Sequence, residues 1–117
     1  MDGARFDDEA LDASTQLLTV VGELDLSSVG KLRRQIESAF ANGPPQLVID
    51  LSGVTHMDST GLAELISAHQ RAMELEGRLI LVVSSAPIRR TLQIRGVVSL
   101  FTVVESRDGA RELLGAG

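Results

Sequence analysis

The segment at residues 46–51 restricts the possible folds of this chain more than any other. Apart from Gln46 and Asp50 it is entirely apolar, and segments with helical periodicity lie on both sides of it. A short apolar run without polar alternation is typical of a strand that is buried on both faces of a parallel sheet. Because parallel strands are joined by crossover helices, the segment predicts an α/β fold built from right-handed βαβ units.

The residues before this segment predict two strands and a helix. Residues 16–24 have the composition of a strand that runs into a turn, and residues 5–11 are expected to form an earlier strand, joined to it as a hairpin through residues 12–15. Ser27 or Ser28 is expected to cap the following helix, which residues 42–45 should end. The apolar face of that helix is predicted to consist of Val29, Leu32, Ile36, Ala39 and Phe40.

The residues after it repeat the alternation. We expect a connector over residues 52–58, a helix over residues 60–75 with Gly77 as its C-cap, and a strand over residues 78–83. The inner face of this helix is predicted to carry Leu62, Leu65, Ile66, His69 and Met73. The remaining expected elements are a helix that starts within residues 84–87 and ends before Gly96, a strand near residues 101–104 and a helix over residues 108–114.

Together these elements predict one domain over residues 1–117, with its core between about residues 16 and 114. The expected architecture is α/β, with a mixed, mostly parallel sheet of four to five strands and about four helices. A hydrophobic fraction of 44% is ordinary for a globular protein. A domain of this size can therefore bury enough apolar surface to fold without disulfides or a structural metal.

Composition argues against several classes of function. The chain has no cysteine, which excludes disulfides, thiolate metal sites and cysteine nucleophiles. Its net charge is −5 and only 3% of its residues are aromatic, so we expect no binding to nucleic acid. No apolar run approaches the roughly 18 residues of a membrane span, and the acidic first residues lack a hydrophobic signal region. The sequence therefore predicts a cytoplasmic protein without membrane contact.

Two loops that follow predicted strands, at residues 22–25 and 55–62, are the candidate functional region, because open α/β sheets bind ligands there. The second loop places Asp58, Ser59 and Thr60 at the start of an amphipathic helix. One interpretation is capping, since such side chains accept hydrogen bonds from free backbone N–H groups. The other is that a kinase phosphorylates Ser59. A helix N-terminus tolerates a phosphate, whereas roughly two added negative charges beside Asp58 would repel a docking partner.

Three motifs follow one another along the chain. They are Gly22-Glu23-Leu24-Asp25, the apolar strand with its continuation through residues 48–54, and Met57-Asp58-Ser59-Thr60-Gly61-Leu62. In order and spacing they resemble the STAS domain of bacterial anti-sigma factor antagonists, and the likeness extends from about Leu17 to Leu114. The most specific part of this likeness is the segment Asp58-Ser59-Thr60-Gly61-Leu62, which follows an apolar strand.

The resemblance implies a regulator and not an enzyme. In that family, an anti-sigma factor that is itself a serine kinase phosphorylates the serine after the motif aspartate, which here is Ser59. The unmodified antagonist binds this kinase and releases a sigma factor, whereas the phosphorylated form is released until a metal-dependent, PP2C-type phosphatase restores it. No cofactor of its own is implied. The partner-binding residues implied are Glu23, Asp25, Asp58, Thr60, Gly61 and Leu62.

Two alternatives remain open at this point. One is a STAS scaffold or accessory subunit of a stress-signalling or transport assembly. The other is an enzyme or small-ligand binder. Three absences from the sequence argue against it: a Gly-x-Ser-x-Gly elbow, glycine-rich phosphate loops and histidines at zinc-ligand spacing. The oligomeric state is left open between a monomer and a weak dimer.

Several other polar residues are given simpler interpretations. We expect His69 in the core or at its boundary and His56 at the surface. Arg89, Arg90 and Arg95 form a basic group on the helix after residues 84–87, where a solvated face is the first interpretation and a secondary contact with an acidic partner the second.

Overall fold

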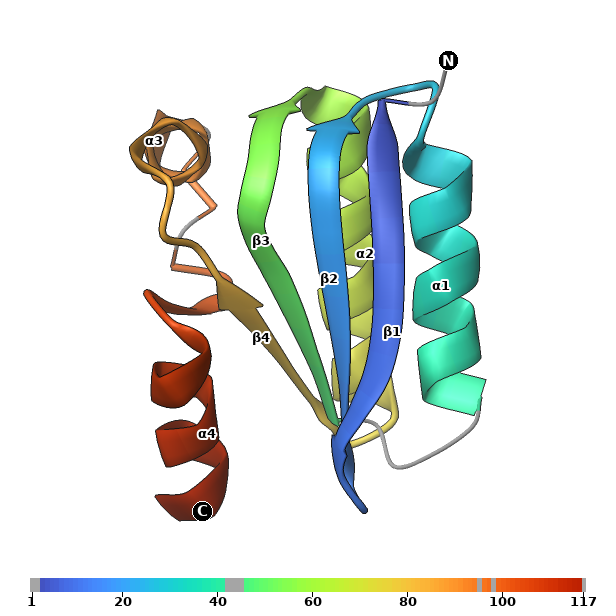
Figure 1. The fold of residues 1–117 in the computed structure, drawn as a ribbon, viewed down its shortest axis with the longest axis vertical. Coiled ribbons are helices and arrows are strands. Elements are labelled where there is room, and N and C mark those ends of the chain that lie inside the picture. Colours follow the sequence, from blue (N-terminus) through green and yellow to red (C-terminus); the bar gives the residue numbers. More distant parts are fainter. Residues whose placement is uncertain (1–2, 42–45, 95, 98, 117) are drawn as a thin grey trace.

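The computed structural model describes residues 3–41, 46–94, 96–97 and 99–116. They form one five-stranded sheet, in the order β1-β2-β3-β4-β5, and four helices (Figure 1). The predicted α/β class and mixed sheet are confirmed. The elements are β1 (Ala4–Asp12), β2 (Thr15–Leu24), α1 (Val29–Ala41), β3 (Gln46–Met57), α2 (Ser59–Glu74), β4 (Arg78–Val82), α3 (Ala86–Ile94), β5 (Thr102–Val104) and α4 (Arg107–Ala116).

The sheet begins with the predicted hairpin and continues with parallel strands. β1 pairs antiparallel with β2, and the Asp12 carboxylate closes the turn between them by accepting a hydrogen bond from the Ser14 backbone N–H at 2.7 Å. β2 to β5 are parallel and follow in chain order. Because these four strands point the same way, the loops after their carboxyl ends lie along one edge of the sheet.

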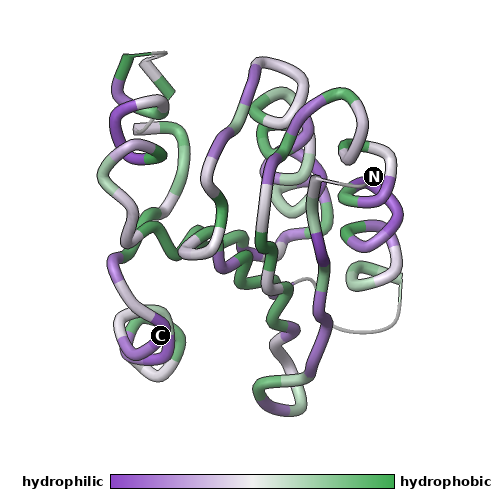
Figure 2. Tube along the Cα trace, turned by 45° about the horizontal axis from the view of Figure 1, so that its top comes forward, coloured by the Kyte–Doolittle hydropathy of each residue, from purple (hydrophilic) through white to green (hydrophobic). Residues whose placement is uncertain are grey.

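The helices cover the two faces of the sheet unequally. The main core lies on the face that α1, α2 and α3 cover, as right-handed crossovers between consecutive strands require. Figure 2 shows α1 banded along its length, because one side of it faces this core and the other faces solvent. On the opposite face α4 packs against a smaller cluster, which contains Leu17, Val48, Ile80, Val82 and Ala110.

A buried ion pair fastens α4 to the sheet. The Oδ2 atom of Asp50 accepts a hydrogen bond from Nε of Arg107 at 2.6 Å, and Nη2 of Arg107 donates to the Thr19 hydroxyl at 2.9 Å. Oδ1 of Asp50 accepts the Ser52 backbone N–H at 2.9 Å. Burial raises the pKa of Asp50, but the hydrogen bonds from Arg107 and Ser52 outweigh it and hold that pKa below its ordinary value.

Residues 52–57, predicted as a connector, belong to β3, so that prediction is wrong. β3 continues to Met57 and pairs with β2 as far as Leu24, whereas β4 ends opposite Asp50. The extension therefore has a neighbouring strand on one side only, and polar residues can remain exposed within it. The sequence pattern did not indicate a strand here because three of its residues are polar and exposed: Ser52, Thr55 and His56.

Helix α2 differs from the prediction in two places. Met73 is 62% exposed, so its placement on the inner face is wrong, and the small residues Ala68 and Ala72 are buried there instead. At the end of the helix, Glu76 has the left-handed φ of 58° that was expected of Gly77. Both residues close the helix, because their backbone N–H groups donate to carbonyls of its last turn, at 3.0 Å for Glu76 and 2.7 Å for Gly77.

Candidate functional site

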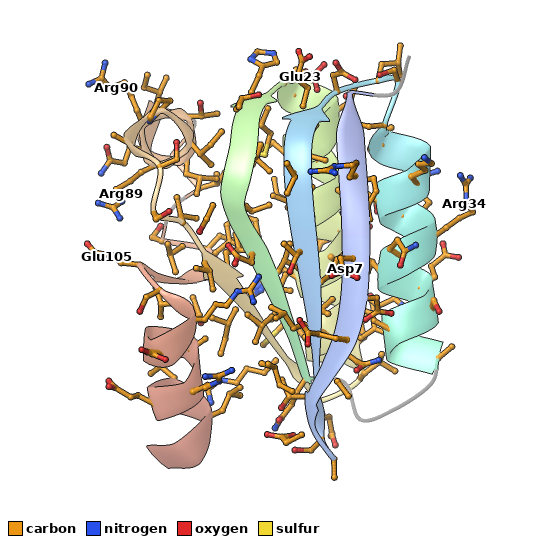
Figure 3. All side chains as sticks on the ribbon, viewed as in Figure 1. Asp7, Glu23, Arg34, Arg89, Arg90 and Glu105 are labelled. Atoms are coloured by element: carbon orange, nitrogen blue, oxygen red, sulfur yellow. The ribbon has the colours of Figure 1, made fainter. Side chains whose placement is uncertain are left out.

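The loops after β2 and β3 are in direct contact at the carboxyl edge of the sheet. The backbone N–H of Asp58 donates a hydrogen bond to the Leu24 carbonyl at 3.0 Å. Glu23, which Figure 3 shows at the end of β2, is exposed and lies opposite His56 in the register of the two strands. The structure therefore brings together the two loops that the sequence singled out, and His56 is exposed as predicted.

Asp58 is the N-cap of α2. Its Oδ1 atom accepts hydrogen bonds from the Thr60 hydroxyl at 2.6 Å, the Thr60 backbone N–H at 2.9 Å and the Gly61 backbone N–H at 3.1 Å. The hydrogen bond from the Thr60 hydroxyl, followed by that from Gly61, holds the pKa of Asp58 below its ordinary value, and His56 adds to this effect. Asp58 is therefore ionised at neutral pH.

Ser59 is the first residue of α2 and is exposed. Its hydroxyl makes no hydrogen bond within the described ranges, because Asp58 and not Ser59 satisfies the free N–H groups of the first turn. The two interpretations of the sequence thus belong to different residues. Capping is performed by Asp58, and Ser59 is left with an accessible hydroxyl beside an ionised carboxylate.

Asp25 gives the loop after β2 the same local structure. Its Oδ1 atom accepts the Ser27 backbone N–H at 3.0 Å and the Ser27 hydroxyl at 2.6 Å. Its backbone N–H donates to the Ser28 hydroxyl at 3.1 Å, and its carbonyl accepts the N–H groups of Ser28 and Val29. Asp25 therefore closes the turn that precedes α1. Ser28, one of the two residues predicted as the cap, lies directly before α1, and its carbonyl accepts the Leu32 N–H at 3.2 Å, whereas its hydroxyl bonds Asp25 and not the helix.

Gly61 and Leu62 lie beneath this edge and not on it. Both are buried, and Leu62 belongs to the main core. A Cβ atom at Gly61 would lie 2.8 Å from the Leu24 carbonyl oxygen, a distance that real Cβ atoms essentially never show, and 3.0 Å from Leu24 Cβ. The missing side chain therefore lets the first turn of α2 approach the end of β2.

A surface groove runs from this edge between α1 and α2. It is lined by Leu26, Val29, Arg33, Thr60, Ala63, Glu64 and Ser67, and Ser59 is not among its lining residues. Leu26 is 76% exposed at its rim. Inside it, Nε of Arg33 donates to Oε1 of Glu64 at 2.8 Å, although the Glu64 side chain is only 8% exposed.

The sequence analysis missed the groove residues Leu26, Arg33 and Glu64. One signal was available in the sequence. Gly61 and Ala68 lie three residues before and four residues after Glu64, on the same side of α2, and both face inward. A carboxylate on an inner face requires a partner, but nothing in the sequence indicated that this partner would be Arg33.

The remaining candidates do not join this site. His69 is half-buried and its ring lies edge-to-face with that of Phe101 at 5.7 Å, which confirms its placement at the core boundary. Across the part of the chain that the structure describes, no three histidine or acidic residues are placed to hold a metal ion. Within the same ranges, no helix combines the length and apolarity that crossing a bilayer requires.

Two arginines of the predicted basic group, Arg89 and Arg90 on α3, differ in their exposure. Arg90 extends into solvent, as the first interpretation predicts, but Arg89 is half-buried (Figure 3). Nη2 of Arg89 donates to the Val83 carbonyl at 3.0 Å and lies 3.4 Å from the Glu105 carboxylate. Arg95 and the predicted helix stop at residues 42–45 lie outside the described residues.

Comparison with known proteins finds anti-sigma factor antagonists that are similar to this chain in sequence and in fold. An anti-sigma F factor antagonist of Lysinibacillus sphaericus is 29% identical over 90 residues, which cover 76% of this chain and 77% of that protein. An anti-sigma factor antagonist from Mycobacterium paratuberculosis superposes with a TM-score of 0.85 at 27% identity, covering 94% of this chain and 92% of that one.

The likeness extends to a more distant structure and to a family profile. The anti-sigma factor antagonist SpoIIAA in its unphosphorylated form has the same fold, with a TM-score of 0.79 at 22% identity over 95% of this chain and 97% of that one. The STAS domain profile matches residues 11–110, which include β2 to β5 and both loops of the site. The resemblance drawn from the three sequence motifs is thereby confirmed, and this chain belongs to the STAS domain family.

Proposed function

We propose that this protein is an anti-sigma factor antagonist that phosphorylation of Ser59 inactivates. The observation that carries the proposal is the exposed Ser59 hydroxyl, which makes no hydrogen bond in the described part of the chain and lies beside the ionised cap Asp58. Relatives with about the same length of chain are named anti-sigma factor antagonists. In this role the protein is a cytoplasmic regulator and not an enzyme.

Phosphorylation at Ser59 would be carried out by the partner, an anti-sigma factor serine kinase. The Ser59 Oγ attacks the γ-phosphorus of ATP, the O–P bond to the β-phosphate breaks, ADP leaves, and the hydroxyl proton passes to a base of the kinase. The ATP, its magnesium and the catalytic groups all belong to the kinase. A PP2C-type phosphatase would return the serine by hydrolysis.

The phosphate would act on the partner interface and not on the fold. The first turn of α2 tolerates an added anion, because free N–H groups and the helix dipole point toward it. A docked partner, in contrast, would meet roughly two new negative charges next to the ionised Asp58. Charge repulsion, together with the cost of removing water from the phosphate on docking, releases the partner while the domain remains folded.

The proposed docking surface joins the two capped loops. Its accessible part consists of the exposed residues Glu23, Leu26 and Ser59 and the half-buried residues Asp25, Asp58 and Thr60. Gly61 and Leu62, which the family resemblance also implicates, contribute from below by setting the position of the helix start against Leu24. Leu26 is the apolar anchor of this surface, because an exposed leucine among carboxylates and hydroxyls gains most from burial in a partner.

The test is intact mass after incubation with ATP and a candidate anti-sigma kinase from the same organism. Wild type should gain one phosphate and Ser59→Ala none. Ser27→Ala is the matched control, because Ser27 is another exposed serine in the adjoining loop whose hydroxyl already donates to Asp25, and it should be phosphorylated like wild type.

Other outcomes of this test point elsewhere. Binding to the kinase without any phosphate would leave an unregulated antagonist and contradict the switch. If wild type neither binds the kinase nor gains a phosphate, the proposal is contradicted, and the alternative of a STAS scaffold or accessory subunit is favoured.

A further inference from the structure

The groove between α1 and α2 contains a charged side chain whose hydrogen-bonding capacity is only partly used. Arg33 donates from Nε to Glu64, and within the described ranges its two terminal nitrogens, Nη1 and Nη2, donate no hydrogen bond. The Arg33 side chain is 59% exposed, whereas that of Glu64 is 8% exposed. The pair therefore has one buried end and one end that is open to the groove and to solvent.

From this geometry we infer that Arg33 is a specificity-determining residue that binds a carboxylate of the anti-sigma partner, and that Glu64 is the positioning residue that holds it. The inference rests on the proposed function, because it assigns a partner contact to the docking surface defined above. It extends that surface from the edge of the sheet into the groove, through Leu26 and Thr60, which belong to both.

Glu64 explains why the arginine is prepared for this contact. A free arginine side chain loses rotamer freedom when a partner immobilises it, and this loss opposes binding. The 2.8 Å bond to a buried carboxylate already restricts the guanidinium before docking. Burial of a carboxylate is itself unfavourable, so the burial of Glu64 alone does not show that this pair serves stability.

The chemistry of the groove selects the occupant. A guanidinium with two unused terminal nitrogens matches the two oxygens of one carboxylate, which it can bind through parallel hydrogen bonds. The flanking groove residues Leu26, Val29 and Ala63 are apolar, so an aspartate or glutamate beside an apolar side chain fits best. A polyanionic surface such as an anionic membrane is disfavoured, because Arg33 is paired with Glu64 and the whole chain has a net charge of −5.

The experiment compares two neighbouring arginines of α1. Arg33→Glu should weaken binding of the anti-sigma factor by about tenfold or more, because a carboxylate then faces a carboxylate. Arg34→Glu changes the net charge equally, but Arg34 points away from the groove into solvent (Figure 3) and lines no part of it. This control should bind within about twofold of wild type. Dissociation constants from calorimetry at about 50 and about 300 mM salt provide the readout.

A second variant separates recognition from folding. Arg33→Gln keeps a hydrogen-bond donor for Glu64 but removes the charge, so it should fold like wild type by circular dichroism and show a shallower salt dependence of binding. Equal affinities of Arg33→Glu and Arg34→Glu, or an unchanged salt dependence of Arg33→Gln, would overturn the inference. Failure of wild type to bind any anti-sigma factor would instead contradict the proposed function.

Discussion

Two carboxylate–arginine pairs with nearly the same local geometry lie on opposite faces of the sheet. In each, an arginine Nε contacts a carboxylate oxygen, at 2.6 Å for Asp50–Arg107 and 2.8 Å for Glu64–Arg33, and each carboxylate side chain is 8% exposed. In the first pair both side chains have further partners within the fold, because Asp50 also accepts a hydrogen bond from the Ser52 backbone N–H and Arg107 also donates one to the Thr19 hydroxyl. The second ends at a surface groove with guanidinium donors unused.

The difference shows that burial of a charge does not by itself reveal its purpose. Asp50 lies in the middle of β3 with a paired strand on either side, and hydrogen bonds from Ser52 and Arg107 hold its carboxylate within the fold. Glu64 lies on α2 beside an open groove, and its partner Arg33 is 59% exposed, against 41% for Arg107. The first pair is therefore expected to contribute to stability and the second to recognition.

The largest expected effect is that of Arg107→Met, which leaves the Asp50 carboxylate buried without its ionic partner. It should lower the free energy of unfolding by about 2–3 kcal/mol, less than for a fully dry pair because the Arg107 side chain is 41% exposed. Urea denaturation followed by circular dichroism measures this quantity. Binding of the anti-sigma factor should not change, and a loss of affinity in a folded variant would break the distinction between the two pairs.

The pH dependence of stability sharpens the same comparison. Because the pKa of Asp50 is lowered in the folded protein, its ionised form stabilises the fold above the unfolded pKa of about 4, and this contribution is lost as the pH falls through the folded value. Wild type should therefore be more stable than Asp50→Asn at neutral pH, and the difference should shrink below about pH 4. Urea denaturation of both proteins across this range tests it; a constant difference would contradict the assignment.

A smaller effect is expected for Arg33→Met on the other face. The free energy of unfolding should fall by about 1 kcal/mol or less, because the Arg33 side chain is 59% exposed and solvent screens its charge. The measurement is the same urea denaturation, made in parallel with Arg107→Met. If the two methionine variants lose equal stability, Glu64–Arg33 is a structural pair like Asp50–Arg107, and the contrast drawn here does not hold.

The smallest effect on stability is expected at Ser59. Since its hydroxyl makes no hydrogen bond in the described part of the chain and is exposed, Ser59→Ala should change the free energy of unfolding by less than about 0.5 kcal/mol. Asp58→Ala, which removes the cap, should lower the melting temperature measurably, and thermal unfolding of the two variants side by side is the check. A large loss for Ser59→Ala would assign it a structural role instead.

Much of the fold could be predicted because its core strands and helices carry local patterns. Residues 46–51 and 78–82 are mostly apolar runs, which are typical of strands in a buried parallel sheet, and they indicate much of the topology. The end of β3 could not be recognised, since a strand with one neighbour keeps polar side chains. Met73 was misplaced because the buried residues in that part of α2 are Ala68 and Ala72, and alanines are weak markers of a buried face.

The candidate site was only partly predictable. Its motif residues were identified because capping chemistry is local, so that Asp58 and its hydrogen-bond partners lie within a few residues of one another. The role of Asp25 in closing the turn before α1 was not predicted, because the sequence offered Ser27 and Ser28 as equally suitable polar residues there. Contacts between distant positions, such as Arg33 with Glu64 or Arg107 with Asp50, follow from the packing of whole elements and leave no local signal in one sequence.

Gly61 has a consequence for how such domains can diverge in evolution. By keeping α2 against the end of β2, it holds the two capped loops at one fixed separation that does not depend on which side chains they expose. The exposed residues Leu26, Arg33 and Ser59 can then be exchanged without rebuilding the frame beneath them. Duplicated copies of the gene could acquire new partners through a few surface substitutions and would inherit a working scaffold unchanged.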